Sequence, residues 1–125
     1  MNTMLFVMLC VCGGFGACAR YLIEGLIASR LSSAVPWGTI LINLSGSFLL
    51  GLLTGLVSQH LLPQAWQLVI GTGFLGGYTT FSTASFQTVS LLRDGYPITS
   101  LFNAFGTLCG ALAAAGFGLL VASWW

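Results

Sequence analysis

Long apolar segments, interrupted only by short polar stretches, occupy almost all of this 125-residue chain. A helix that spans a bilayer needs about 20 predominantly apolar residues, which four such segments can supply here. Charged residues make up 4% of the sequence, whereas soluble domains carry about a quarter. The pattern therefore predicts an all-α integral membrane protein, with residues 1–125 forming one domain of four transmembrane helices.

The polar stretches set the expected helix boundaries. The four helices are expected at Thr3–Ser29, Trp37–Ser58, Ala65–Leu92 and Pro97–Ser123. The first is expected to be retained rather than cleaved as a leader, because no Lys or Arg precedes it. In this arrangement Arg30 and Arg93 lie on one side of the membrane and no Lys or Arg lies on the other. Because this bias is small, the sequence is compatible with insertion in both orientations.

The third expected helix contains Gly71–Thr83, in which four glycines precede four hydroxyl residues around one Phe. Glycine costs about 1 kcal/mol relative to alanine inside a helix, and the pair Gly76-Gly77 favours a break. A break in hydrocarbon leaves peptide groups unpaired, at several kcal/mol each, unless protein, ions or water satisfy them. The segment therefore predicts a third helix broken in mid-membrane, where the backbone is buried in protein or lines a path.

Small and polar residues recur every four positions on the second helix, at Thr39, Asn43, Ser47, Gly51 and Gly55. This spacing predicts a single face on which another helix packs closely. A buried Asn amide needs partners in a medium of low dielectric constant. Asn43 is therefore expected either to form an interhelical hydrogen bond or to face a permeating species.

Two further surfaces of small residues are expected to pack closely against other helices. They are Gly13-Gly14-Phe15-Gly16-Ala17 on the first helix and Gly106, Gly110, Ala114 and Gly118 on the fourth.

Arg20 and Glu24 are spaced i,i+4 and share a face of the first helix. Two interpretations are equally favoured. The pair is a salt bridge at the membrane boundary, or Arg20 lines an aqueous mouth that attracts anions.

The sequence lacks a catalytic constellation, and the protein is expected not to be an enzyme. It has no Ser–His–acid or Cys–His set, no pair of intramembrane carboxylates and no phosphate-binding loop. The four cysteines match no zinc spacing and are expected to be small packing residues. A net charge of +1 argues against nucleic-acid binding.

A series of neutral hydrogen-bond donors remains, with Phe81 among them. Such donors suit a small anion that must shed water and then leave, and the positive edge of an aromatic ring offers a weak anion contact. The donors are Thr39, Asn43, Ser47, Thr79, Thr80, Ser82, Thr83, Asn103 and Thr107.

Three motifs in order along the first three helices are similar to those of the CrcB/Fluc fluoride channels. They are Gly13-Gly14-Phe15-Gly16-Ala17-Cys18-Ala19-Arg20-Tyr21, the segment Gly38 to Gly51, and Gly73-Phe74-Leu75-Gly76-Gly77-Tyr78-Thr79-Thr80-Phe81-Ser82-Thr83. The resemblance implies an antiparallel, dual-topology dimer in a prokaryotic inner or plasma membrane. Its two narrow pores would export fluoride passively from the cytoplasm and limit fluoride toxicity.

The resemblance also implies roles for particular residues. Backbone carbonyls of Gly76 and Thr79, from two subunits, would hold a structural sodium ion at the dimer interface. Hard oxygen ligands of this kind suit a hard cation. The implied ion path contains Asn43, Phe81, Ser82, Thr83, Thr107 and Arg20, and Thr39 and Ser47 lie on the expected helix face of Asn43.

The chain departs from the family pattern just after Thr83. Ala84 stands at the position of a second phenylalanine and Gln87 at the position of a glutamate. Phe86 lies about 200° around a helix from Ala84, so it is not a simple replacement. The chain is therefore expected to be a homodimer with altered pores, a subunit of a heteromeric channel, or a non-conducting assembly subunit.

A small multidrug-resistance-type exporter is the remaining alternative. A proton-coupled exporter needs a carboxylate in mid-membrane, whereas Glu24 lies near the end of the first expected helix. This position disfavours the exporter.

Overall fold

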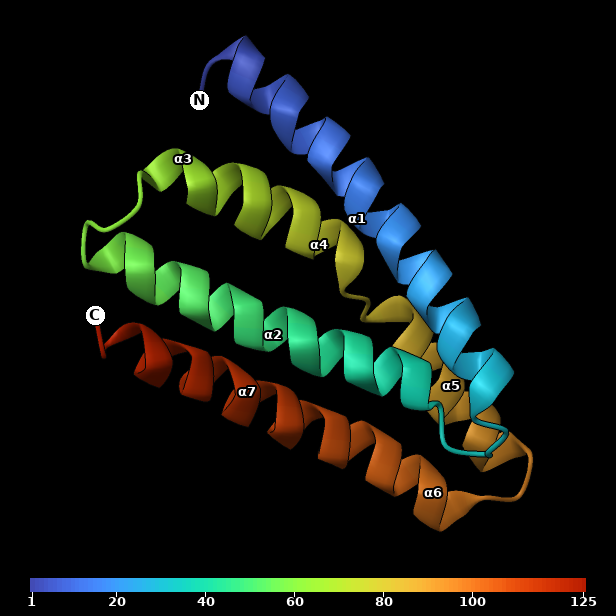
Figure 1. Ribbon diagram of the computed structural model, residues 1–125. Coiled ribbons are helices and arrows are strands. Elements are labelled where there is room, and N and C mark those ends of the chain that lie inside the picture. Colours follow the sequence, from blue (N-terminus) through green and yellow to red (C-terminus); the bar gives the residue numbers. More distant parts are fainter.

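The computed structural model describes residues 1–125, and all of its regular elements are helices (Figure 1). This confirms the predicted all-α class. The elements are α1 (Thr3–Arg30), α2 (Trp37–Ser58), α3 (Gln64–Trp66), η1 (Gln67–Leu75), α4 (Gly76–Tyr78), α5 (Ser82–Arg93), α6 (Pro97–Leu101), η2 (Phe102–Gly106) and α7 (Thr107–Ala122).

Three helices are long and apolar enough to cross a membrane: α1, α2 and the continuous helix Pro97–Ala122 formed by α6, η2 and α7. The third expected helix is in two pieces, because α3, η1 and α4 form one stretch and α5 another. Both η1 and η2 are π-helical, a form that is rare and frequently occurs at functional sites. The predicted bounds of α2 agree with the structure, and α1 ends one residue later than expected.

Successive helical segments alternate in direction, which brings two pairs of segments with the same direction side by side (Figure 1). In one pair α2 packs along α7, and in the other α1 crosses η1 and α4. Both termini and the turn after α2 lie at one end of the molecule, and the loops that follow Arg30 and Arg93 lie at the other. The predicted sidedness of the two arginines is thus confirmed.

Glycines bring α1 into direct backbone contact with η1 and α4. A Cβ atom at Gly73 would lie 2.8 Å from the carbonyl oxygen of Leu9, and one at Gly77 would collide with the carbonyl oxygen of Gly13. The prediction of a close-packing glycine surface on the first helix is confirmed. The predicted break within Gly71–Thr83 is confirmed, but it lies after Gly76-Gly77, because both of these residues are helical. Packing that requires the absence of a side chain outweighs the low helix propensity of glycine.

The contact between α2 and α7 follows the predicted surfaces of small residues. The backbone of Gly51 lies against Ala115, Gly55 lies against the methyl group of Ala122, and Gly118 lies against the carbonyl oxygen of Phe48. Most large apolar side chains outside these contacts are exposed, as expected for helices that face lipid.

Candidate functional site

The third helix is interrupted at Thr79–Phe81, directly after α4. Thr79 is extended, with φ −79° and ψ 158°, whereas the residues on either side of the interruption are helical. Asn43 on α2 pairs with both main-chain groups of Thr80. Its Nδ2 donates to the Thr80 carbonyl oxygen at 2.8 Å, and its Oδ1 accepts from the Thr80 N–H at 2.8 Å.

Thr80 has a partner for each of its polar groups. Its Oγ1 accepts a hydrogen bond from the N–H of Thr83 at 3.2 Å, which caps the first turn of α5. The residue is buried, with 7% of its surface exposed. Unpaired peptide groups at membrane depth would cost several kcal/mol each, so the pairing with Asn43 is a main reason why the break can exist.

The break leaves carbonyl oxygens without a hydrogen-bond partner, those of Gly76 and Thr79 among them. In a continuous helix the Thr80 N–H would bond to the carbonyl oxygen of Gly76, but here it bonds to Asn43. No hydrogen bond at the break ends on the carbonyl oxygen of Gly76 or Thr79. Free carbonyl oxygens of this kind suit a hard cation such as sodium.

A groove of about 890 Å³ runs beside the break, between α2, the third helix, α5 and the fourth helix. No charged side chain lines it. The ring of Phe81 is 87% exposed and lies at the groove. The lining residues with polar side chains are Asn43, Ser47, Gln67, Thr72, Thr79, Thr80, Ser85, Thr88, Asn103 and Thr107.

The groove brings together half of the ion-path residues expected from the sequence: Asn43, Ser47, Phe81 and Thr107. The backbones of Gly76 and Thr79, the expected sodium ligands, join them there. The other four expected path residues do not line it: Thr39, Ser82, Thr83 and Arg20. Ser82 is exposed, and Thr83 and Arg20 are half-buried.

Thr39 lies apart from Asn43 although the two are one turn apart on α2. It is only 3% exposed and lines a different cavity. The prediction of a single face is therefore wrong at this end of the helix. Residues four apart are rotated by about 40° relative to each other, because a turn contains 3.6 residues. Over the four steps from Thr39 to Gly55 these rotations add up, so the residues at the two ends of the series face different sides of the helix.

Thr107 has a buried hydroxyl group without a hydrogen-bond partner. Buried hydroxyl groups normally have a partner, so this oxygen at the groove is an exception that requires an explanation. Its neighbour one turn earlier, Asn103, has hydrogen-bond partners for its amide nitrogen. Its Nδ2 donates to Thr88 Oγ1 at 2.8 Å, and Ser100 Oγ donates to the Thr88 carbonyl oxygen at 2.6 Å, so α5 is held against the fourth helix.

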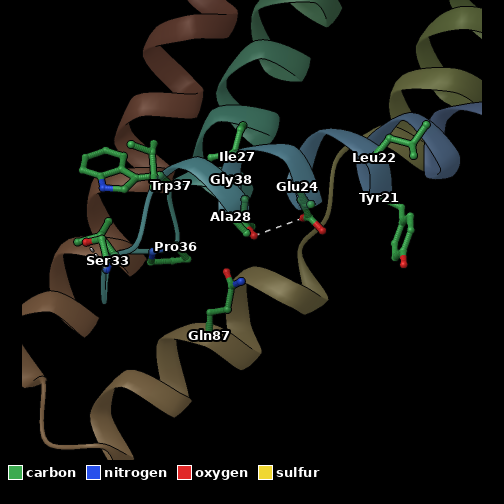
Figure 2. A pocket seen from close by; sticks show the side chains of 14 residues that line it. Tyr21, Leu22, Glu24, Ile27, Ala28, Ser33, Pro36, Trp37, Gly38 and Gln87 are labelled. Atoms are coloured by element: carbon green, nitrogen blue, oxygen red, sulfur yellow. Dashed lines mark hydrogen bonds between the residues drawn. The ribbon is translucent and has the colours of Figure 1, made fainter.

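The second cavity measures about 510 Å³ and lies between α1, α2 and α5 (Figure 2). Thr39 Oγ1 donates a hydrogen bond to Glu24 Oε1 at 3.3 Å, so Glu24 bonds to Thr39 and not to Arg20. Figure 2 shows Gln87 extending from α5 toward the part of α1 that carries Glu24. The Gln87 Oε1 atom is buried and has no partner. The two departures from the family pattern thus occupy different cavities, since Ala84 lines the groove.

Sequence reasoning missed several groove residues on α5 and the third helix. Phe81, Ala84, Ser85 and Thr88 all line the groove and follow the i, i+3, i+4, i+7 spacing of one helix face. That spacing is visible in the sequence and identifies Ser85 and Thr88. Gln67, whose Nε2 donates to Thr54 Oγ1 at 3.1 Å, has no comparable signal.

Comparison with known proteins gives consistent matches over most of the chain. Residues 7–119 match a family model described as CrcB-like protein, Camphor Resistance (CrcB). The chain is 44% identical over 119 residues to the fluoride-specific ion channel FluC 1 of Leifsonia xyli subsp. xyli, covering 95% of this chain and 87% of that protein. It is 39% identical to the fluoride-specific ion channel FluC of Solibacter usitatus, covering 95% of this chain and 98% of that protein. It is 40% identical to the fluoride-specific ion channel FluC 3 of Bifidobacterium longum, covering 97% of this chain and 100% of that protein.

Proposed function

The chain belongs to the CrcB family, and we propose that it is a fluoride-selective passive ion channel that lets fluoride leave the cytoplasm and so limits its toxicity. It is a multi-pass membrane protein of a prokaryotic type. The relatives described above are named as ion channels and not as enzymes.

One observation carries the proposal: a groove with neutral donors and no charged side chain runs beside a broken helix. A fixed positive charge would trap a small anion, and a fixed negative charge would exclude it. Neutral donors replace part of the water shell of the ion and still release it. The exposed Phe81 side chain is available to the ion, and the unpartnered hydroxyl of Thr107 lies buried beside the groove.

The path is proposed to pass Asn43, Ser47, Phe81 and Thr107 in the groove. Ser82 and Thr83 follow Phe81 at the start of α5. Thr39 and Arg20 lie nearer the end of α1 that carries Glu24, and are proposed to act at the mouth of the path.

The groove is open on one side of a single chain, and we propose that a second copy in antiparallel orientation covers it. The small charge bias between the two ends permits both orientations. Gly76 and Thr79 of the two copies would together hold a sodium ion through their carbonyl oxygens. The ion would supply positive charge at the interface and satisfy backbone groups that the break leaves free.

The proposal is tested by reconstituting the purified chain alone in liposomes loaded with fluoride and measuring efflux, with chloride-loaded liposomes as the control. Efflux of fluoride but not chloride is expected. Phe81→Ile should reduce this efflux, while Glu24→Gln should not abolish it because Glu24 lies outside the groove. The opposite pattern, with only Glu24→Gln abolishing transport, would indicate a proton-coupled exporter.

A heteromeric channel is the second candidate, and Ala84 favours it. This small side chain lines the groove where the family pattern has a second phenylalanine. A partner chain that carries the missing ring would complete the pore. If the chain alone gives no efflux, and efflux appears only after a second family member is added, the heteromeric assembly is correct.

A further inference from the structure

We infer that Asn43 is a positioning residue that holds the third helix open at Thr80 and thereby frees the carbonyl oxygen of Gly76. In this role it acts on the path through the backbone of the third helix and not only through contact with an ion. The flux readout of this inference rests on the proposed function, whereas its structural readout does not.

The geometry of the Asn43–Thr80 pair is specific to an open helix. Both polar atoms of the Asn43 amide form hydrogen bonds of 2.8 Å to Thr80, with Nδ2 as the donor and Oδ1 as the acceptor. A single hydrogen bond would let the amide rotate, whereas two fix its plane. The second N–H of Asn43 Nδ2 has no further partner in the chain, and Asn43 is one of the residues that line the groove.

Without this pair, the helix itself would offer another partner to the Thr80 N–H. Gly76 has helical dihedral angles of φ −63° and ψ −38°, and Phe81 has φ −94° and ψ −39°. Helical backbone thus flanks the interruption on both sides, and Thr79 is extended between them. The partner that the helix itself offers to the Thr80 N–H is the carbonyl oxygen of Gly76, four residues earlier. Asn43 competes with that carbonyl and occupies the N–H.

Closing the helix would change two features at once. The Gly76 carbonyl would be used internally and lost to a cation. The direction of α5 would change relative to α4, and Phe81, which begins the α5 side of the break, would leave its position at the groove. Asn43 thus couples the carbonyl oxygens on one side of the break to the aromatic ring on the other.

Ser47 provides a matched control for Asn43. It lies one turn further along α2 and lines the same groove, and no side-chain hydrogen bond joins it to the third helix. Replacing Ser47 removes a polar group from the groove without affecting the break. A residue that acts only as an ion contact should behave like Ser47 and not like Asn43 in any measurement of backbone conformation.

The structural test is NMR of the full chain in lipid nanodiscs, with carbon-13 threonine and with 4-fluorophenylalanine at position 81. Asn43→Ala is expected to move the Thr79 backbone carbon shifts from extended toward helical values and to shift the fluorine signal at 81. Ser47→Ala is expected to change neither. If Asn43→Ala leaves both signals as in the wild type, the inference is wrong.

The functional test replaces Thr80 by its α-hydroxy analogue, which removes the N–H donor and leaves Asn43 and any ion contact in place. This ester has no N–H that could bond to the Gly76 carbonyl oxygen, so Asn43→Ala is expected to lower fluoride efflux less in the ester than in the unmodified chain. An equal fractional loss on Asn43→Ala in the ester and in the unmodified chain would overturn the inference. Absence of efflux from the unmodified chain would contradict the proposed function, while the NMR comparison would still test the role of Asn43.

Discussion

Gly77 of α4 lies directly against the carbonyl oxygen of Gly13 on α1, with no space for a side chain between the two helices. Neighbouring residues repeat this contact, since Gly16 lies equally close to the carbonyl oxygen of Phe74. The segment before the break is therefore held by backbone packing on one side. On the other side Asn43 holds Thr80. The break is fixed between these two attachments.

Gly77→Ala should destabilise the protein, because the new methyl group meets main chain that cannot move aside. Inserting a methyl group into a fully packed site typically costs about 1–3 kcal/mol. A lower midpoint of thermal unfolding in detergent is expected. Gly14→Ala is the matched control, since a Cβ atom at Gly14 meets open space. Equal midpoints for the two variants would contradict this account of the glycine contact.

Thr107→Val should separate stability from conduction. Its hydroxyl oxygen is buried without a partner, so replacing it by a methyl group of similar size should leave stability unchanged or raise it by about 1 kcal/mol. Fluoride efflux should fall, because the path loses a neutral donor.

Thr54→Val makes the same replacement at a hydroxyl that is hydrogen-bonded to Gln67. It should lower the unfolding midpoint, unlike Thr107→Val. If Thr107→Val destabilises the protein as much as Thr54→Val does, the Thr107 hydroxyl has a structural partner after all.

Asn103→Ala should loosen α5 from the fourth helix. Asn103 is 2% exposed and donates to Thr88 Oγ1, so the variant loses a buried interhelical hydrogen bond. A cost of about 0.5–2 kcal/mol is expected from such bonds in membrane proteins. Thr99→Ala, in the same helix and without a side-chain hydrogen bond to α5, serves as the control in thermal unfolding. A smaller loss in Asn103→Ala than in Thr99→Ala would refute the structural role of this bond.

Replacing sodium by the bulky cation N-methylglucamine should weaken the assembly if Gly76 and Thr79 hold an ion. A site that sodium fills at 100 times its dissociation constant contributes about 2.7 kcal/mol, which is lost on removal. The dimer fraction in size-exclusion chromatography measures the effect.

Gly76→Ala should keep the sodium dependence, because it retains the carbonyl oxygen and its Cβ atom meets open space. Equal dimer fractions in both salts would exclude a structural sodium ion.

Local sequence patterns predicted the helices well and placed the break within Gly71–Thr83, where the structure has it at Thr79–Phe81, but did not give its position within that segment. The bounds of α2 and its contact with α7 follow from turn residues and from small residues at four-residue spacing. The break depends on a partner 37 residues away, because Asn43 offers the Thr80 peptide an alternative to its own helix. Propensity alone favours Gly76-Gly77, and only tertiary contacts make the glycines helical and Thr79 extended.

The candidate site was predictable to a similar degree. Asn43, Phe81 and Thr107 were identified as residue types that suit an anion path, and they do share a groove. Four-residue spacing predicts Thr39 on the same face as Asn43, but each four-residue step rotates the side chain by about 40°. The unpartnered oxygens of Thr107 and Gln87 could not be predicted, because a missing partner is visible only when all neighbours are placed.

The free carbonyl oxygens of Gly76 and Thr79 also bear on the biosynthesis of the protein. A newly inserted single copy would expose them toward hydrocarbon, at several kcal/mol for each unsatisfied group. If a second copy covers the groove as proposed, insertion and assembly are energetically linked, and a copy without its partner is a strained species. Cellular levels of this protein should accordingly depend on how fast each copy meets the surface that covers its groove.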